Sequence, residues 1–381
     1  MKKTLITTSI AVAAAAFGLS SYGAPLLALD EDTELFVLGS AGIQYESNLY
    51  TDRVNRVSDF RFTASPGVEI AHGRTPAANA SVTYRHHFHF YDSESTQDGN
   101  YADLSAQARY DTGVTISNIQ ASFRQRASND ADVNLVGRLV KRDETRLNGS
   151  SRYQISELMG ISAGLEYADT SFKDPALTSF DYYAIPLTYY YKVRPQLDLT
   201  AGYRYRNTSV SGPTGDSKDN YFFVGAQGEL GSPMFIGNLS LGYQERKFSG
   251  INDKRSSPSY SFMVSYLATP RITHFANLAY DFRTSSSQGL SYSYGSLTIG
   301  TRARITDMIA TNFSLTYAEA EYQRSPRAED HMFFNAGVTY NPNDYVTIRA
   351  DYAYQSVDGK NTAGASDYRN NRLSVSASVR Y

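Results

Sequence analysis

The final residues of the chain, RLSVSASVRY, alternate strictly between polar and apolar side chains. Leu373, Val375, Ala377, Val379 and Tyr381 occupy the odd positions, and serines and an arginine occupy the even ones. Successive side chains of a β-strand point to opposite faces, so this period of two predicts a strand. One face of that strand meets an apolar environment and the other meets a polar one.

The same alternation recurs along the chain in segments of about ten residues, separated by connections that are alternately short and long. The first three predicted strands span 34–45, 59–71 and 80–91. The short connections are rich in Gly, Pro, Asn and Asp, as tight turns require; they centre on GRTP, YDTG, SELM, KVRP, GSPMF, ATPR, TDM and NPND. The long connections span 46–57, 92–99, 127–137, 168–179, 207–219, 249–257, 284–291, 321–330 and 356–367.

Nine long and eight short connections make seventeen, and seventeen connections join eighteen strands. Bacterial outer-membrane barrels have an even number of strands of roughly 9–11 residues, with long loops outside the cell and short turns in the periplasm. We therefore expect an all-β fold, a transmembrane antiparallel up-and-down β-barrel of about 18 strands, with 16 as the alternative. Residues 24–381 would form this single outer-membrane domain of a Gram-negative cell, and both termini would be periplasmic.

The first residues indicate export. Lys2 and Lys3 precede an apolar run over residues 5–19, and Ser21, Tyr22 and Gly23 follow it. This arrangement is typical of a cleaved signal peptide, which we assign to residues 1–23.

Composition excludes several classes of protein. Mean hydropathy is −0.41 and the apolar fraction is 41%, which is too polar for a helical membrane protein. Lys and Arg number 36 against 38 Asp and Glu, so nothing favours a nucleic-acid partner. Tyrosines recur near strand ends, as in the aromatic girdles of a barrel that contacts outer-membrane lipid; they are Tyr84, Tyr110, Tyr153, Tyr167, Tyr189, Tyr203, Tyr266, Tyr280, Tyr317, Tyr340, Tyr352 and Tyr381.

If the apolar face meets lipid, the alternate positions line the lumen. They are predicted to include Arg85, His87, His89, Arg109, Arg124, Arg126, Arg204, Arg206, Arg283, Arg302, Arg304, Arg349, Arg372 and Arg380. The acidic residues assigned to this register are fewer: Glu69, Asp103, Asp198, Glu229, Asp281 and Asp351. Excess arginine would attract anions, whereas arginine–carboxylate pairs would cross-link the interior, and the sequence leaves both interpretations open.

Catalytic and metal chemistry find little support. His87 and His89 share a face, but beyond Asp92 no third ligand is near, so a polar lumen stripe is favoured over a metal site. No motif links His331, Glu329 and Asp330 to a serine. SGPTGDSKD lacks the spacing of a phosphate-binding loop and is interpreted as a surface loop. We expect no enzyme activity, no metal and no cofactor.

Residues 41–70, AGIQYESNLYTDRVNRVSDFRFTASPGVEI, resemble the opening hairpin of an outer-membrane β-barrel porin family associated with exopolysaccharide (Wzy-type) export gene clusters. The resemblance lies in Tyr45-Glu46-Ser47-Asn48, Ser58-Asp59 and Pro66-Gly67, and VRPQLDLTAGYRYRN resembles the middle strands of the family. It implies a pore for an anionic or neutral secreted polysaccharide, working with a periplasmic polysaccharide-export protein. It identifies no site residues.

Three functions follow as hypotheses. The first is passive export of exopolysaccharide through an Arg- and Tyr-lined lumen. The second is a general or anion-selective diffusion porin for small solutes, and the third is a structural or adhesive barrel. The terminal strand, with Leu373, Val375, Ala377, Val379 and Tyr381, is predicted to be the signal for the barrel-assembly machinery and to pair with the first strand, since an open edge cannot lie in lipid.

Overall fold

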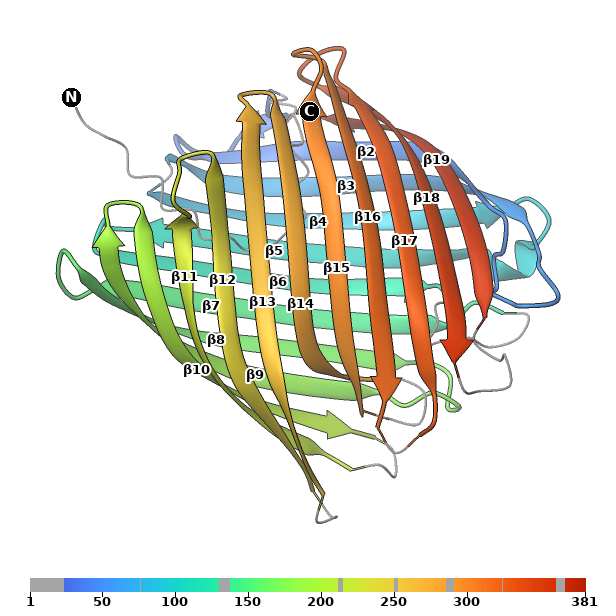
Figure 1. The fold of residues 1–381 in the computed structure, drawn as a ribbon. Helices are drawn as coiled ribbons and strands as arrows, with labels where there is room; N and C mark the ends of the chain where they lie inside the picture. The colour runs from blue at the N-terminus through green and yellow to red at the C-terminus, as the bar shows by residue number, and fades with distance from the viewer. Residues whose placement is uncertain are drawn as a thin grey trace.

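The computed structural model describes residues 24–75, 77–129, 138–211, 215–249, 253–285, 291–323, 325–360 and 367–381. The predicted signal peptide, residues 1–23, lies outside the described residues. All the strands belong to a single large sheet (Figure 1). The two-residue strand β1 (Leu27–Ala28) is the first of them along the chain, and a 3-10 turn η1 spans Ser95–Gln97. In the described ranges no helix is both long and apolar enough to cross a membrane.

The sheet is a closed antiparallel barrel of 18 strands, as the alternation predicted. Each strand pairs with its neighbours in sequence, and the last pairs with β2, so the alternative of 16 strands was wrong. In chain order the strands are β2 (Thr33–Glu46), β3 (Asp59–Thr75), β4 (Ala78–Tyr91), β5 (Gly99–Asp111), β6 (Thr115–Ala127), β7 (Lys141–Gln154), β8 (Met159–Phe172), β9 (Phe180–Arg194), β10 (Leu197–Val210), β11 (Ser217–Glu229), β12 (Phe235–Phe248), β13 (Lys254–Thr269), β14 (Ile272–Thr284), β15 (Ser291–Arg304), β16 (Ile309–Tyr322), β17 (Ala328–Tyr340), β18 (Val346–Lys360) and β19 (Tyr368–Arg380).

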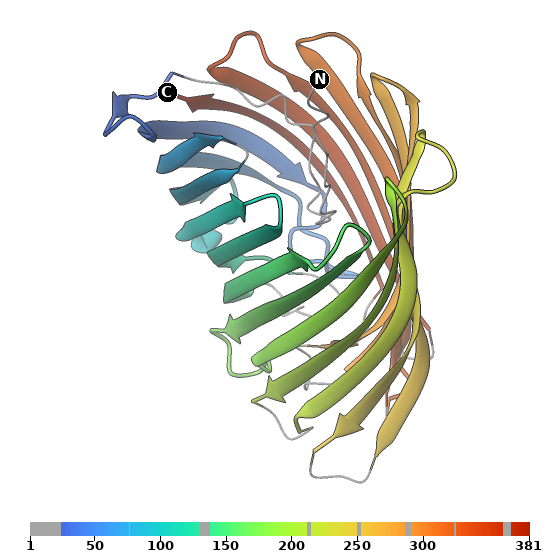
Figure 2. The same cartoon turned by 90° about the vertical axis from the view of Figure 1, so that its left-hand side faces the viewer.

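Two ends of the barrel are distinguished by their connections. We call the end with the short connections and residues 24–33 and 381 the turn end, and the opposite end the loop end. The longest connections, 47–58 and 128–140, are both at the loop end. Figure 2 shows the wall of β2–β9 facing the wall of β12–β19 across the interior.

The strands are longer than predicted. They have 13–17 residues; β3 and β4, for example, run beyond their predicted bounds to Thr75 and from Ala78 at the turn end. The predicted loops 207–219 and 356–367 were too long. β11 already begins at Ser217, and β18 runs to Lys360. The polar residues at these ends of β11 and β18 still form backbone hydrogen bonds with the neighbouring strands. Their sequence lacks the alternation of apolar and polar residues by which a strand is recognised.

The outward face is apolar in the middle and aromatic near both ends. Val37, Val224 and Leu241 are among the exposed aliphatic residues of this band. At the loop end the rings of Tyr203 and Phe222 have centroids 4.8 Å apart, and at the turn end those of Phe235 and Tyr266 are also 4.8 Å apart. Exposed aromatic girdles on either side of an aliphatic band are the surface that a bilayer-spanning barrel presents to lipid. 

The seam between β19 and β2 closes the barrel. The ladder runs from Arg372 opposite Glu46 to Arg380 opposite Leu38, which confirms the predicted pairing of the last strand with the first. Tyr381 then exchanges both backbone hydrogen bonds with Val37. Beyond this point β1 takes over as partner of β2, opposite Glu34 and Leu35, so the first residues of β2 also lie in a paired ladder.

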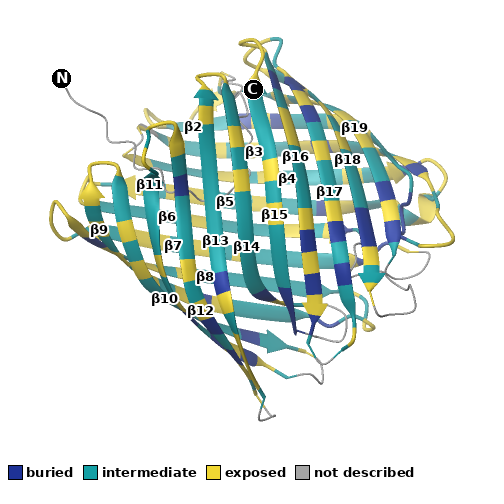
Figure 3. Cartoon of the chain, viewed as in Figure 1, coloured by how far each residue is buried: buried dark blue, intermediate teal, exposed yellow. Residues whose placement is uncertain are grey.

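Buried residues gather at the loop end. Figure 3 shows them near the lower ends of β16–β19, whereas the middle of the barrel has few. The inward face of a closed sheet lines a lumen instead of a packed core. A side chain on that face is therefore buried only where other side chains or loops cross the lumen. The described residues do this in two places, and both are part of the candidate site.

We predict that deleting Tyr381 lowers the amount of assembled barrel. The deletion removes both backbone bonds to Val37 and the contact of the Tyr381 ring with Tyr345, whose centroids are 5.9 Å apart. The fraction of folded, heat-modifiable protein in the membrane would be measured by electrophoresis without boiling. Tyr381→Phe, which keeps the ring and the backbone, should assemble normally; equal membrane levels of the deletion variant and the wild type would refute the prediction.

Candidate functional site

The inward face near the middle of β4–β7 carries short hydroxyl and amide side chains. A groove of about 280 Å³ lies over it. We call it the polar groove; it is lined by Ser81, Thr83, Ser105, Ala106, Gln107, Gln120, Ala121, Ser122, Arg124, Arg146 and Asn148. Hydroxyl and amide groups both donate and accept hydrogen bonds, so such a surface suits water or a hydroxyl-rich solute.

A larger cavity of about 440 Å³ lies next to the polar groove, toward the loop end, and shares Arg124 with it. We call it the arginine pocket. Its lining residues are Gln44, Glu46, Leu49, Thr51, Arg61, His87, His89, Tyr91, Tyr101, Asp103, Arg124, Gln125, Arg126, Ala127, Ser128, Asn129, Leu139, Asn370 and Arg372. Cavities of roughly 300–1,000 Å³ are the usual size of small-molecule sites.

The arginine pocket is electropositive. Its lining contains four guanidinium groups and two carboxylates. Arg372 binds Glu46 at 2.6 Å and Arg124 lies 3.4 Å from Asp103, so two of the four charges are neutralised within the lining. Arg126 has only a longer contact, 3.8 Å, with Glu144. The Nη2 of Arg61 donates to the neutral amide oxygen of Gln44 at 3.0 Å, which leaves the charge of Arg61 uncompensated by this partner.

The β2–β3 loop (47–58) covers this pocket and continues the barrel seam. After the Glu46–Arg372 pair, the Oγ of Ser47 accepts from the backbone N–H of Asn371 at 2.8 Å. Asn48, fully buried, donates its backbone N–H to Asn370 and its side-chain amide to the carbonyls of Arg369 and Asp52. Glu46, the last residue of β2, and the two residues that follow it therefore fix the loop to β19.

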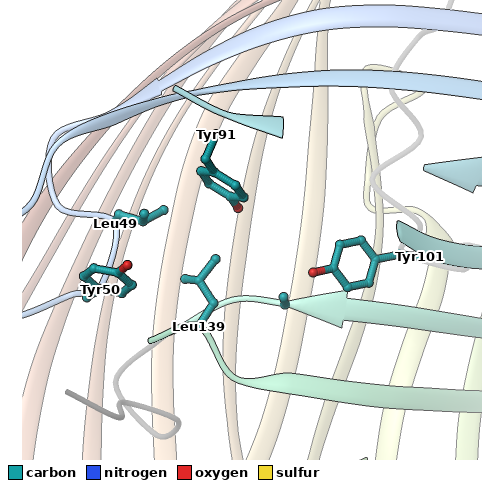
Figure 4. Close-up of a cluster of buried hydrophobic side chains, with 6 residues drawn as sticks. Leu49, Tyr50, Tyr91, Tyr101 and Leu139 are labelled. Atoms are coloured by element: carbon teal, nitrogen blue, oxygen red, sulfur yellow. The ribbon is translucent and has the colours of Figure 1, made fainter. Parts of the chain in front are cut away.

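Side chains from two loops and from β4 and β5 meet at the arginine pocket. Figure 4 shows Leu49 and Tyr50 facing Tyr91, Tyr101 and Leu139, and all five belong to one buried cluster. The hydroxyl of Tyr50 donates to Glu94 at 2.7 Å. Burial, together with this hydrogen bond, raises the pKa of the Tyr50 hydroxyl well above its usual range. The loop is therefore packed against its neighbours rather than free in solvent.

Thr51 shows that this loop is held in a strained conformation. Its φ is 52°, and among the described residues it is the sole residue other than glycine with positive φ. A β-branched residue adopts this region at a cost of order 1–3 kcal/mol. The surrounding bonds maintain it: Thr51 donates its backbone N–H to the carbonyl of Asn48, and Asp52 donates its own to the Asn48 side chain.

The second place where side chains and a loop cross the lumen lies on β10–β15. Pairing of β13 with β14 ends at Tyr260 opposite Tyr280, although β13 stays paired with β12 as far as Lys254. The last residues of β14 instead contact strands further around the barrel. Arg206 of β10 donates to the carbonyl of Phe282 at 2.9 Å, and Arg246 of β12 donates to that of Arg283 at 3.0 Å. The end of the β14–β15 hairpin therefore lies across the inward faces of β10–β12.

Four charged residues hold this hairpin, and two of them, Asp219 and Arg246, are buried. Asp219 accepts hydrogen bonds from Arg206 at 2.6 Å and from Arg246 at 2.7 Å. Arg206 also binds Asp281 at 3.2 Å, and Arg204 approaches the same carboxylate at 3.2 Å. We call Arg206, Asp219, Arg246 and Asp281 the ion cluster. Each arginine of the ion cluster is paired with at least one of its carboxylates. Replacing one charged residue removes that pairing from its partners, which is costly where the partner is buried.

The predicted lumen residues therefore lie in different surroundings. Eight of the fourteen pair with a carboxylate within 4 Å: Arg109, Arg124, Arg126, Arg204, Arg206, Arg349, Arg372 and Arg380. Arg283 and Arg302 lie over the rings of Tyr294 and Phe275. Arg85, His87, His89 and Arg304 form no ion pair within the described ranges, and only Arg124, Arg126, Arg372, His87 and His89 line the arginine pocket.

Several of the residues that form these sites were not predicted from the sequence. Glu46, Asp219 and Glu329 fell inside predicted connections, so the carboxylates facing the arginines were undercounted, and the expected excess of arginine is smaller than predicted. Arg61 was also missed, although Phe60 and Phe62 on the outward face place it inward by alternation. The surface-loop interpretation of residues 211–219 was wrong for Ser217–Asp219, which start β11; residues 212–214 lie outside the described ranges.

The histidines singled out in the sequence have contacts with neighbouring side chains. The Nδ1 of His87 bonds the hydroxyl of Ser65 at 2.8 Å, and no group of three His, Cys, Asp or Glu suited to a metal occurs among the described residues. His331 lies 3.3 Å from Glu329, whose carboxylate also binds Arg327 and Tyr322. That contact set ties β17 to β16 and their loop.

The comparisons with known proteins agree with this geometry. The crystal structures of OpdK (12% identity, TM-score 0.51) and OccK2 (11%, 0.51) from Pseudomonas aeruginosa are similar over 91% and 92% of this chain and 99% and 98% of theirs. A BenF-like porin from Pseudomonas fluorescens Pf-5 is similar at 10% identity and TM-score 0.52, over 92% of this chain and 99% of its own. The fold is that of an outer-membrane β-barrel.

In sequence, residues 296–381 match the model of a family described as "Putative beta-barrel porin 2". The match covers most of β15 and all of β16–β19. The resemblance to an export-associated porin family rests on residues of β2, the β2–β3 loop, β3, the end of β9 and β10, all of which lie outside the matched range. No curated protein sequence matches the chain.

We predict that Asn48→Ala releases the β2–β3 loop. The substitution removes the side-chain bonds of Asn48 to Asp52 and Arg369, so trypsin should cut the loop at Arg53 and Arg56 several-fold faster in the purified barrel. Asn55→Ala is the matched control, because only the backbone of Asn55 is bonded within this loop. Equal cleavage rates for the two variants would contradict a fixed loop.

We predict that Asp219→Asn loosens the β14–β15 hairpin. It leaves Arg206 and Arg246 without their shared carboxylate, at a cost of about 3–5 kcal/mol. Single-channel recordings should show a larger and noisier conductance, with a lower unfolding midpoint. The control is Asp351→Asn, which breaks only a 3.8 Å contact with Arg349 on the inward face and should change neither the conductance nor the unfolding midpoint. An Asp219→Asn channel identical to wild type would show that Asp219 does not fix the hairpin.

Proposed function

We propose that the protein is an outer-membrane channel through which exopolysaccharide leaves the cell. The turn end faces the periplasm, so both termini are periplasmic, and the loop end faces outside. This orientation follows the general rule that short turns are periplasmic and longer loops extracellular. The protein depends on the barrel-assembly machinery for insertion, and a periplasmic polysaccharide-export protein delivers the polymer to the turn end.

One observation carries the proposal: the polar groove and the arginine pocket adjoin and share Arg124. A hydroxyl-rich chain would exchange hydrogen bonds with Ser, Thr, Asn and Gln side chains along the groove before it reaches the guanidinium groups near the exit. These neutral partners bind weakly and can be replaced by water, which favours movement along the surface. Export is passive at this step, with polymer synthesis supplying the force.

The pocket charges favour a second candidate, an anion-selective diffusion porin for small solutes. Arg61 and Arg126 have no close carboxylate partner within the pocket, so the potential there attracts anions of any size. Bilayer recordings separate the two functions, because a diffusion porin would conduct freely and be blocked by small anions.

Blocking the lumen in cells tests the export function. The chain contains no cysteine, so a single introduced thiol can be labelled selectively. Gln44→Cys places it in the arginine pocket, and Ile43→Cys places it on the neighbouring residue of β2, whose side chain is on the outward face. Each variant would be expressed in a deletion strain, treated with a bulky thiol reagent, and assayed for surface and periplasmic polysaccharide.

We expect the deletion strain to lose surface polysaccharide and retain material in the periplasm. Both cysteine variants should restore export, and the reagent should stop it only for Gln44→Cys. Normal surface polysaccharide in the deletion strain would disprove the export function. Export that continues at full rate after complete labelling of Gln44→Cys would disprove passage beside this pocket.

A further inference from the structure

Three polar atoms in the arginine pocket have no hydrogen-bond partner although they are shielded from solvent. They are the Nε of Arg61, the Nδ1 of His89 and the hydroxyl of Tyr101. All three residues line the same cavity, and they come from β3, β4 and β5. Tyr101 is only 6% exposed, so its hydroxyl cannot simply turn into bulk water. Native proteins rarely leave buried polar groups unpaired, and each one needs an explanation.

The side chains that carry these atoms are fixed by other contacts. Arg61 donates through Nη2 to Gln44, which leaves the Nε edge of the guanidinium unused. The rings of His89 and Tyr101 lie with centroids 5.0 Å apart. Gly99 allows this position of Tyr101, since a Cβ there would be 2.5 Å from the hydroxyl. The unpaired atoms are therefore held in place before any ligand arrives, which lowers the ordering cost of binding.

The chemistry of the three groups defines what would satisfy them. The Nε–H of Arg61 only donates and prefers a carboxylate oxygen. The tyrosine hydroxyl and a neutral imidazole can each donate or accept, as neighbouring sugar hydroxyls also can. A carboxylate flanked by hydroxyl groups on one ring meets all these requirements at once.

We propose that the arginine pocket is a binding subsite for an acidic sugar unit, whose carboxylate pairs with Arg61 and whose hydroxyls bond Tyr101 and His89. This inference rests on the proposed export function and adds the class of sugar to it. Arg126, with only its 3.8 Å contact to Glu144, supplies further positive charge nearby. The polar groove would hold the adjoining units of the same chain through its amides and hydroxyls.

Binding to the purified full-length barrel in detergent tests the proposal. Isothermal titration would use four probes: glucuronate, an oligomer of uronic acids, glucose and inorganic sulfate. We expect glucuronate to bind and glucose to bind at least tenfold more weakly, because a charge-assisted bond to arginine is worth about a factor of ten or more. The oligomer should bind more tightly than glucuronate if a polymer is the natural ligand; equal affinities would assign the site to free acidic monosaccharides.

Variants then assign the site. Arg61→Gln should weaken uronate binding about tenfold, and Tyr101→Phe should weaken it several-fold while leaving the ring in place. Arg61→Lys keeps the charge without the planar fork and should fall between wild type and Arg61→Gln. Arg302→Gln, which removes the same charge from the inward face of β15, should bind as wild type does. Retention of the folded, heat-modifiable form would show that each variant still forms the barrel.

Equal binding of glucose and glucuronate, or unchanged uronate binding by Arg61→Gln, would overturn the proposal. Sulfate binding equal to that of glucuronate would reduce the pocket to a general anion site and would also overturn it. These outcomes are independent of the export assay. Uronate binding in a protein whose deletion leaves export intact would disprove the export function alone, and export without uronate selectivity would disprove only the subsite.

Discussion

Closure of the backbone hydrogen-bond ladder is the constraint on which the whole structure depends. An apolar outer face leaves no water to satisfy a free strand edge, so β19 must pair with β2. The same seam then continues past the strands. Glu46, Ser47 and Asn48 bind Arg372, Asn371 and Asn370 in turn, so the loop over the arginine pocket is attached to the point where the barrel closes.

Two different kinds of contact narrow the lumen, one on each of two facing walls. On the side of β2–β6 an aromatic and aliphatic cluster packs the loops over an electropositive pocket. On the side of β10–β15 the ion cluster holds the end of a hairpin by buried charge pairs, with Asp219 between two guanidinium groups. The paired charges of the ion cluster cross-link the interior, which is one of the two interpretations that the sequence left open. The other, attraction of anions, is the role that the proposed function gives to Arg61 and Arg126.

The fold could be predicted from sequence because a barrel strand repeats one local rule, and the 18 strands and the β2–β19 pairing are confirmed. The site was predicted less well. Arg124, Arg126, His87 and His89 line the arginine pocket as inward residues, but Glu46 and Asp219 lie where strands extend beyond the apolar band and lose the alternation. The inward path of the β14–β15 hairpin depends on Arg206 meeting Asp281, residues 75 positions apart. Local periodicity contains no information about such a contact.

The central claim is that this barrel encloses a conducting polar lumen that passes the electropositive arginine pocket. The most direct measurement is the zero-current potential of the purified protein in a planar bilayer under a potassium chloride gradient. The account predicts an open channel with a potential of the sign given by preferential chloride passage. A channel that prefers potassium, or a correctly folded barrel that does not conduct, would contradict it.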